Sequence, residues 1–213
     1  MFLRPIIILV CLSFLAACQE KGHDAATDKY PWEVTVLPGG NSQVFGIRFY
    51  ETTLAEAKQK LGRRPDIALF ENKDGHLSVE VYYKEFDRGG LSANLLLTLA
   101  QDDALFERLK QQAVGHKRGE SGVIKYALSD TGLRQVDTRP ISGLTYVPYA
   151  NLDEEMVSKR FGEPAHKIRT HEQAQHWLYP EKGLDLIINA EGKEILQFVP
   201  PLEFERLARP LQP

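Results

Sequence analysis

Four short sequence patterns occur twice in this chain, in the same order and about one hundred residues apart. Each set has a Gly-aromatic segment, a helix-start pattern, a Gly followed by a Pro, and the tetrapeptide Phe-Glu-Arg-Leu. The first set lies at residues 46–49, 53–56, 60–65 and 106–109, and the second at 143–146, 151–154, 160–164 and 204–207. One match could arise by chance, but four in register indicate a structural unit that is present in two copies.

Each copy contains the start and end signals of a short helix. Thr53 with Glu56, and Asn151 with Glu154, have the spacing of a capping box, in which the two side chains bind free backbone N–H groups of the first turn. Apolar residues follow at helical spacing, and a Gly and a Pro then stop the helix. We therefore expect one short helix after Thr53 and another after Asn151.

Segments that are typical of strands follow each predicted helix. They lie at residues 67–71, 76–83 and 91–99 in the first copy and at 166–170, 175–179, 184–189 and 194–199 in the second. Further strands are expected at residues 32–37, 44–50, 123–128 and 133–138. Short turns between consecutive segments predict antiparallel meanders.

A polar, glycine-rich stretch at residues 115–122 separates the two copies and is predicted to be a boundary. We expect an α+β fold of two tandem lobes, residues 30–115 and residues 122–213. Each lobe is predicted to pack a short helical element on its own small antiparallel sheet.

Several motifs of the second copy resemble those of a known family. They are Gly143-Leu144-Thr145 before the predicted helix, Phe161-Gly162-Glu163-Pro164 at its end, Trp177-Leu178-Tyr179, the apolar segment 184–188, and the turn Gly192-Lys193. Together they resemble the BamE/SmpA-type outer-membrane lipoproteins, mainly over residues 143–199. The resemblance implies a helical element on a small antiparallel sheet, a fold that the tandem β-lactamase inhibitor protein shares. It also implies a role in envelope assembly or in the inhibition of an envelope enzyme.

The N-terminus has the layout of a secretory signal peptide, with Arg4, a short apolar run and two alanines. The run is too short for a permanent membrane-spanning helix. The sequence Leu-Ala-Ala-Cys at residues 15–18 resembles the bacterial lipobox, in which the cysteine is acylated and becomes the new N-terminus. We therefore expect a signal peptide at residues 1–17, lipidation at Cys18, and a flexible polar tether at residues 18–29. The alternative is an ordinary secreted protein with an incidental cysteine.

Charge and cysteine content narrow the range of partners. The chain has 26 Lys and Arg against 29 Asp and Glu, so it lacks the basic excess that neutralises phosphates, and nucleic acid is not an expected partner. Both cysteines, Cys11 and Cys18, lie in the N-terminal segment, so the rest of the chain cannot form a disulfide. By resemblance to lipoproteins, Gln19 after the cysteine implies an outer-membrane location facing the periplasm.

Three histidines, His166, His171 and His176, suggest a metal-dependent enzyme or an envelope hydrolase as an alternative function. His171 and His176 are five residues apart, whereas a zinc-binding helix needs a spacing of four to place both on one face. In strands, an odd interval places side chains on opposite faces of the sheet. We therefore interpret them as solvated or turn residues, and expect neither a metal site, nor a cofactor, nor catalytic residues.

Aromatic residues are the better candidates for a binding surface. Tyr82 and Tyr83 are adjacent in a predicted strand, so at least one faces outward. Trp177 and Tyr179 share one face of another strand and are either core residues or binding anchors. Large aromatic side chains dominate interface energetics, so these four residues are the candidate binding site.

Taken together, these features predict a lipid-anchored periplasmic protein that binds or assembles an envelope protein and is not an enzyme. The rival predictions are the envelope hydrolase and a purely structural envelope lipoprotein.

A first prediction concerns the anchor. Replacing Cys18 by Ala should abolish acylation and membrane fractionation, because no other cysteine can replace this thiol in the mature chain. The downstream domain should still fold. Intact-mass measurement checks this, and a mature protein that begins elsewhere or carries no acyl mass would contradict it.

Overall fold

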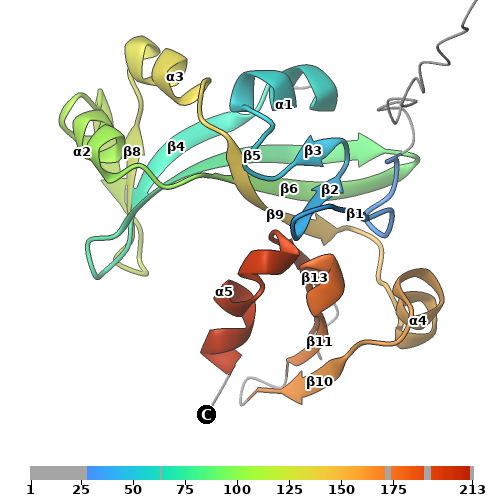
Figure 1. Ribbon diagram of the computed structural model, residues 1–213. Helices are drawn as coiled ribbons and strands as arrows, with labels where there is room; N and C mark the ends of the chain where they lie inside the picture. The colour runs from blue at the N-terminus through green and yellow to red at the C-terminus, as the bar shows by residue number, and fades with distance from the viewer. Residues whose placement is uncertain (1–27, 63, 171–173, 190–192, 212–213) are drawn as a thin grey trace, which may run out of the picture.

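The computed structural model describes residues 28–62, 64–170, 174–189 and 193–211. Strands account for 41% of the structure and helices for 25%, so the protein is mostly β (Figure 1). The predicted α+β class is therefore wrong. The predicted lipidation site Cys18, the signal peptide, residues 18–27 of the tether and His171 lie outside the described residues.

Ten strands form one antiparallel sheet, in the order β10-β11-β12-β13-β9-β6-β5-β4-β8-β7. Their bounds are β4 (Asp66–Glu71), β5 (Leu77–Arg88), β6 (Leu91–Leu99), β7 (Gly115–Arg118), β8 (Ile124–Ala127), β9 (Ile141–Pro148), β10 (His166–Arg169), β11 (Gln175–Tyr179), β12 (Leu184–Ile188) and β13 (Ile195–Phe198). A second sheet has the order β1 (Thr35–Leu37), β2 (Asn41–Val44) and β3 (Ile47–Arg48). Most of the predicted strands are confirmed.

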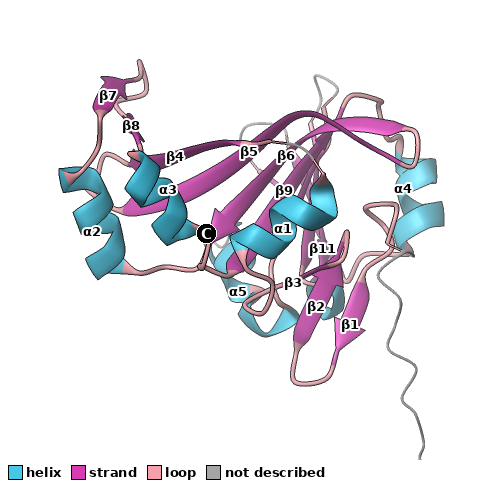
Figure 2. Cartoon of the chain, turned by 90° about the horizontal axis from the view of Figure 1, so that it is seen from above, coloured by secondary structure: helices cyan, strands magenta, loops and turns pink. Residues whose placement is uncertain are grey.

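Short helices connect and cover the strands. They are α1 (Leu54–Leu61), α2 (Asp103–Gln111), α3 (Asp130–Val136), α4 (Glu154–Phe161) and α5 (Glu205–Ala208), with 3₁₀ turns η1 (Pro180–Lys182), η2 (Pro201–Glu203) and η3 (Arg209–Leu211). Figure 2 shows α1, α2 and α3 together beside the strands β4, β5 and β6, and Figure 1 shows α1 and α3 above these strands and α5 below them.

The two predicted sheets are one continuous sheet, because β6 of the first copy pairs with β9 of the second. In this pairing Leu95 lies opposite Tyr146, and Leu97 lies opposite Leu144. All four side chains are buried in a single hydrophobic cluster. Two separate sheets would leave these apolar strands as unpaired edges, which explains why the prediction of separate sheets is wrong.

The polar segment 115–122 also differs from the expected boundary. Its first part is strand β7, which pairs with β8 and forms one edge of the sheet. Strand β8 in turn pairs with β4, which belongs to the first copy. The chain therefore returns to the first half of the sheet after the predicted boundary.

Helix α1 begins as the sequence predicts. The Thr53 hydroxyl accepts a hydrogen bond from the Glu56 N–H, and the Glu56 carboxylate accepts one from the Thr53 N–H. Gly62 ends the helix in the left-handed conformation, with φ of 74°. In the second copy the cap is Asp153 instead of the predicted Asn151, because the Asp153 carboxylate accepts the Met156 N–H.

One predicted strand is a helix. The sequence predicts a strand at residues 133–138, but residues 133–136 belong to α3. Ser129 caps this helix by accepting the Gly132 N–H, and Leu133 and Val136 lie three residues apart on the face that packs against the core. A short segment of this pattern is compatible with a strand or with a helix. The Ser129 cap favours the helix here.

Candidate functional site

The two faces of the large sheet have different surroundings. In β5, Val79, Val81 and Tyr83 are buried in the core, whereas the alternate side chains are half-buried and point to the other face. We call this second surface the open face. Its half-buried members, from four central strands, are Phe70, Ser78, Glu80, Tyr82, Asn94, Leu96, Thr98, Thr145 and Val147.

Strand register places several of these side chains side by side. Tyr82 lies opposite Asp66 on one neighbouring strand and opposite Leu96 on the other. Leu96 in turn lies opposite Thr145, which lies opposite Gln197. Directly opposite residues have Cβ atoms about 4.5–5.5 Å apart, so these five form a continuous cross-strand row.

Glu80 is an unusual member of the open face. Partial burial raises the pKa of its carboxyl group, and the charge of Lys125 offsets part of this effect. Among the described residues, none hydrogen bonds or forms an ion pair with the Glu80 carboxylate. The Lys125 ammonium lies over the Phe70 ring, 5.8 Å from its centre. Glu80 is therefore a partly desolvated anion without a direct partner.

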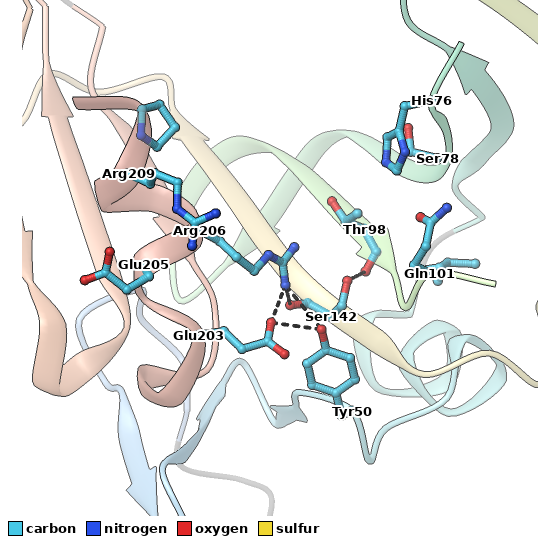
Figure 3. A pocket seen from close by; sticks show the side chains of 12 residues that line it. Tyr50, His76, Ser78, Thr98, Gln101, Ser142, Glu203, Glu205, Arg206 and Arg209 are labelled. Atoms are coloured by element: carbon cyan, nitrogen blue, oxygen red, sulfur yellow. Dashed lines mark hydrogen bonds and ion pairs between the residues drawn. The ribbon is translucent and has the colours of Figure 1, made fainter. Parts of the chain in front are cut away.

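A cleft of about 720 Å³ adjoins one end of the open face. Ser78 and Thr98 belong to both surfaces, and the C-terminal segment that contains α5 forms the opposite wall (Figure 3). The cleft is lined by Tyr50, His76, Ser78, Thr98, Leu99, Gln101, Ser142, Glu203, Glu205, Arg206, Arg209 and Pro210.

Arg206 joins the cleft walls through three acceptors. Its Nη1 donates to the Glu203 carboxylate, to Tyr50 Oη at 3.2 Å and to the Ser142 carbonyl at 3.5 Å. The Tyr50 hydroxyl donates to Glu203 Oε2 at 2.9 Å. Burial raises the pKa of this hydroxyl, and Glu203 raises it further. Tyr50 has a φ of 59°, a strained backbone conformation for a tyrosine.

Three of the four predicted binding aromatics are core residues. Tyr83 and Trp177 are each 1% exposed, and Tyr179 is 4% exposed and donates its hydroxyl hydrogen to the Gly162 carbonyl. The Lys167 ammonium covers the Trp177 ring, 3.4 Å from its centre. These rings therefore have almost no surface for a partner, whereas Tyr82 lies half-buried on the open face.

The two described histidines of the predicted set, His166 and His176, have different environments. His166 is exposed on β10, whereas His176 is buried on β11, so the expectation of a solvated residue is wrong for His176. Its Nδ1 lies 2.8 Å from Asp185 Oδ2. Burial raises the pKa of Asp185, and the hydrogen bond from His176 opposes that shift. Among the residues that the structure describes, no cluster of three metal-binding side chains occurs.

Sequence reasoning missed Glu80 and the arginines of the cleft. Arg206 lies within the repeated Phe-Glu-Arg-Leu tetrapeptide, which indicated a structural repeat but no chemistry. For Glu80, the sequence offered one indication of a role in binding. Side chains alternate along a strand, so Glu80 shares a face with the candidate Tyr82.

Comparisons with protein-family models, with curated proteins and with solved structures found no match for this chain. Within the described ranges, none of the helices has both the length and the apolar character that crossing a membrane requires.

A second prediction separates core aromatics from surface aromatics. Trp177→Ala should lower the free energy of unfolding by about 3–5 kcal/mol, because it removes a large buried side chain. Tyr82→Ala should lower it by about 1 kcal/mol or less, because only cross-strand contacts are lost. Urea denaturation measures both values, and equal losses would contradict the assignment of faces.

Proposed function

We propose that this protein is a lipid-anchored envelope protein that binds another protein through the open face of its sheet, without catalysis. The observation that supports it is the uncovered centre of the sheet, where Tyr82, Leu96 and Val147 are half-buried around polar neighbours. A face with apolar centres and a polar surround has the composition of a protein interface.

Charge indicates the chemistry of the partner. Asp66 lies beside Tyr82 in the cross-strand row, and Glu80 is a partly desolvated carboxylate on the same face. Partial burial of an unpaired charge disfavours the free protein, and a cation of a partner would relieve that cost. The proposed partner therefore presents an Arg or Lys side chain next to an apolar patch.

The N-terminal sequence supports the location. The lipobox-like sequence at residues 15–18 provides an acylation site at Cys18, and the polar residues up to residue 29 provide a tether. The Gln at position 19 favours the outer membrane, with the domain in the periplasm. A tethered domain meets other envelope proteins at a high effective concentration, so moderate affinity is sufficient.

The His176–Asp185 pair is the observation that favours the rival hydrolase. An Asp that orients a His is part of many hydrolytic sites. His176, however, has a side chain that is only 11% exposed. Within the described ranges, Asp185 is the one hydrogen-bonding partner of the His176 imidazole, and no serine hydroxyl bonds to that ring. A buried structural pair accounts for this geometry.

Site-specific photo-crosslinking in growing cells tests the binding face. A photoreactive phenylalanine analogue at Leu96 or Val147 should give the same protein adduct, because both side chains are on the open face. The matched controls are Val36 and Val114, which are 53% and 73% exposed elsewhere on the molecule. Adding Glu80→Lys should abolish the adduct by repelling the partner's cation.

Each other outcome contradicts the proposal. The face is wrong if Leu96 and Val147 give no adduct, or if Val36 and Val114 give equal adducts. The kind of partner is wrong if the adduct contains lipid or a second copy of the chain. The role of charge is wrong if Glu80→Lys leaves the adduct unchanged.

A fourth prediction links binding and stability at Glu80. The pKa of its carboxyl group is raised in the folded state, so stability falls as pH rises from the unfolded pKa through the folded pKa, and the cost is absent below the unfolded pKa. Glu80→Gln should therefore increase the melting temperature at pH 7 but not at pH 3. It should also weaken binding of the crosslinked partner. Thermal unfolding at the two pH values measures the first effect, and a lower melting temperature at pH 7 would contradict it.

A further inference from the structure

The cleft has the dimensions of a ligand site, and its arginines give it a chemistry that the centre of the open face lacks, although Ser78 and Thr98 belong to both surfaces. Its volume of about 720 Å³ lies within the range of small-molecule pockets, about 300–1,000 Å³. Its walls come from distant parts of the chain, namely the segment after β3, the ends of β5 and β6, and the C-terminal segment. Figure 3 shows the polar side chains of these walls around one space.

One wall carries oriented cationic donors. All three hydrogen bonds of the Arg206 guanidinium use Nη1, so its Nε and Nη2 groups make no hydrogen bond to the described chain. Glu203, Tyr50 and the Ser142 carbonyl hold this guanidinium in place. Arg209 lines the same cleft, and its guanidinium has no ion pair or hydrogen bond among the described residues, although its backbone N–H donates to the Glu205 carbonyl. Arginine forks suit carboxylates, which they bind through two parallel hydrogen bonds.

The charge balance of the cleft leaves room for one anion. Glu203 is paired with Arg206. Figure 3 shows the Glu205 carboxylate pointing away from the space, toward which Arg206 extends. The positive charge of Arg209 is therefore not neutralised by a neighbouring carboxylate of the described chain. A monoanion matches this arrangement better than a dianion does.

The opposite wall carries neutral polar groups. The hydroxyls of Ser78 and Thr98 make no hydrogen bond within the described chain, and the His76 ring is also available. Gln101 donates its amide hydrogens to the Leu77 carbonyl and to Asp103, which leaves its own carbonyl oxygen as an acceptor. Such mixed donors and acceptors suit the hydroxyl groups of a ligand.

From these observations we infer that the cleft is a binding site for a hydroxylated monocarboxylate, a sugar acid by chemical class. Its carboxylate lies at Arg209 and the free side of Arg206. Its hydroxyl groups face Ser78, Thr98 and Gln101. The inference does not rest on the proposed protein partner, because the ligand carboxylate is assigned to Arg209 and Arg206, and the cleft and the open face share only Ser78 and Thr98.

Calorimetric titration of the full chain in nonionic detergent tests the site, with D-glucuronate as the probe. Glucuronate should bind more tightly than D-glucose, which lacks the carboxylate, and than acetate, which lacks the hydroxyl groups. Arg209→Gln should weaken glucuronate binding at least about tenfold. The matched control is Arg169→Gln, because Arg169 is exposed on β10 and does not line the cleft.

Thr98→Val separates a sugar-acid site from a general anion site. It should weaken glucuronate binding and leave acetate binding unchanged, because it removes only the hydroxyl. Equal affinities for glucuronate, acetate and inorganic phosphate would overturn the inference. So would an Arg209→Gln variant that keeps the native circular dichroism spectrum and binds glucuronate as the unmodified chain does. Crosslinking from Leu96 should persist in Arg209→Gln, so failure of this site and failure of the protein-binding face are distinguishable.

Discussion

The pairing of β6 with β9 is the interaction on which the rest of the structure depends. It joins strands from the two sequence copies through seven consecutive register partners from Ala93 to Leu99, with one irregularity near Thr98. On the core face it brings Leu95 against Tyr146 and Leu97 against Leu144, so both halves bury their apolar side chains in one cluster. A single large core excludes more apolar surface from water than two small ones. On the other face, the same pairing extends the open face across the junction through Leu96 and Thr145.

The open face exists because most of the covering elements lie on one side of the sheet. Helices α1, α2 and α3 lie on the core side of β4, β5 and β6, whereas the short C-terminal segment lies on the other side (Figure 1). Phe204 is 7% exposed, and Arg206 binds Tyr50 and the Ser142 carbonyl, so a buried ring and a charged network hold this segment. The cleft is the space that remains between the segment and the ends of the strands.

Local signals predicted local structure, and the unpredicted features are long-range. The capping box at Thr53, the strands β5 and β6, and the opposite faces of Tyr82 and Tyr83 are encoded within a few residues, and all were predicted. The β6–β9 pairing joins residues about fifty positions apart, which leaves no local pattern. Trp177 and Tyr179 share a face in any strand, but only the packing of α4 and of neighbouring strands decides that this face is the core. The Phe-Glu-Arg-Leu repeat likewise contains Arg206, but the repeat gives no indication that Tyr50 and Glu203 form hydrogen bonds with this arginine.

The two edges of the large sheet bear on how a partner can bind. An unpaired edge strand is a template for addition of another strand, and lysine on the edge counteracts this. The edge strands here are Gly115–Arg118, with the sequence GHKR, and His166–Arg169, with the sequence HKIR. Both edges are basic, whereas the centre of the open face presents Asp66 and Glu80, with Lys125 over the neighbouring Phe70 ring. A partner with a basic contact patch is therefore repelled from the edges and attracted to the face, so the charge distribution favours binding across the sheet over strand addition.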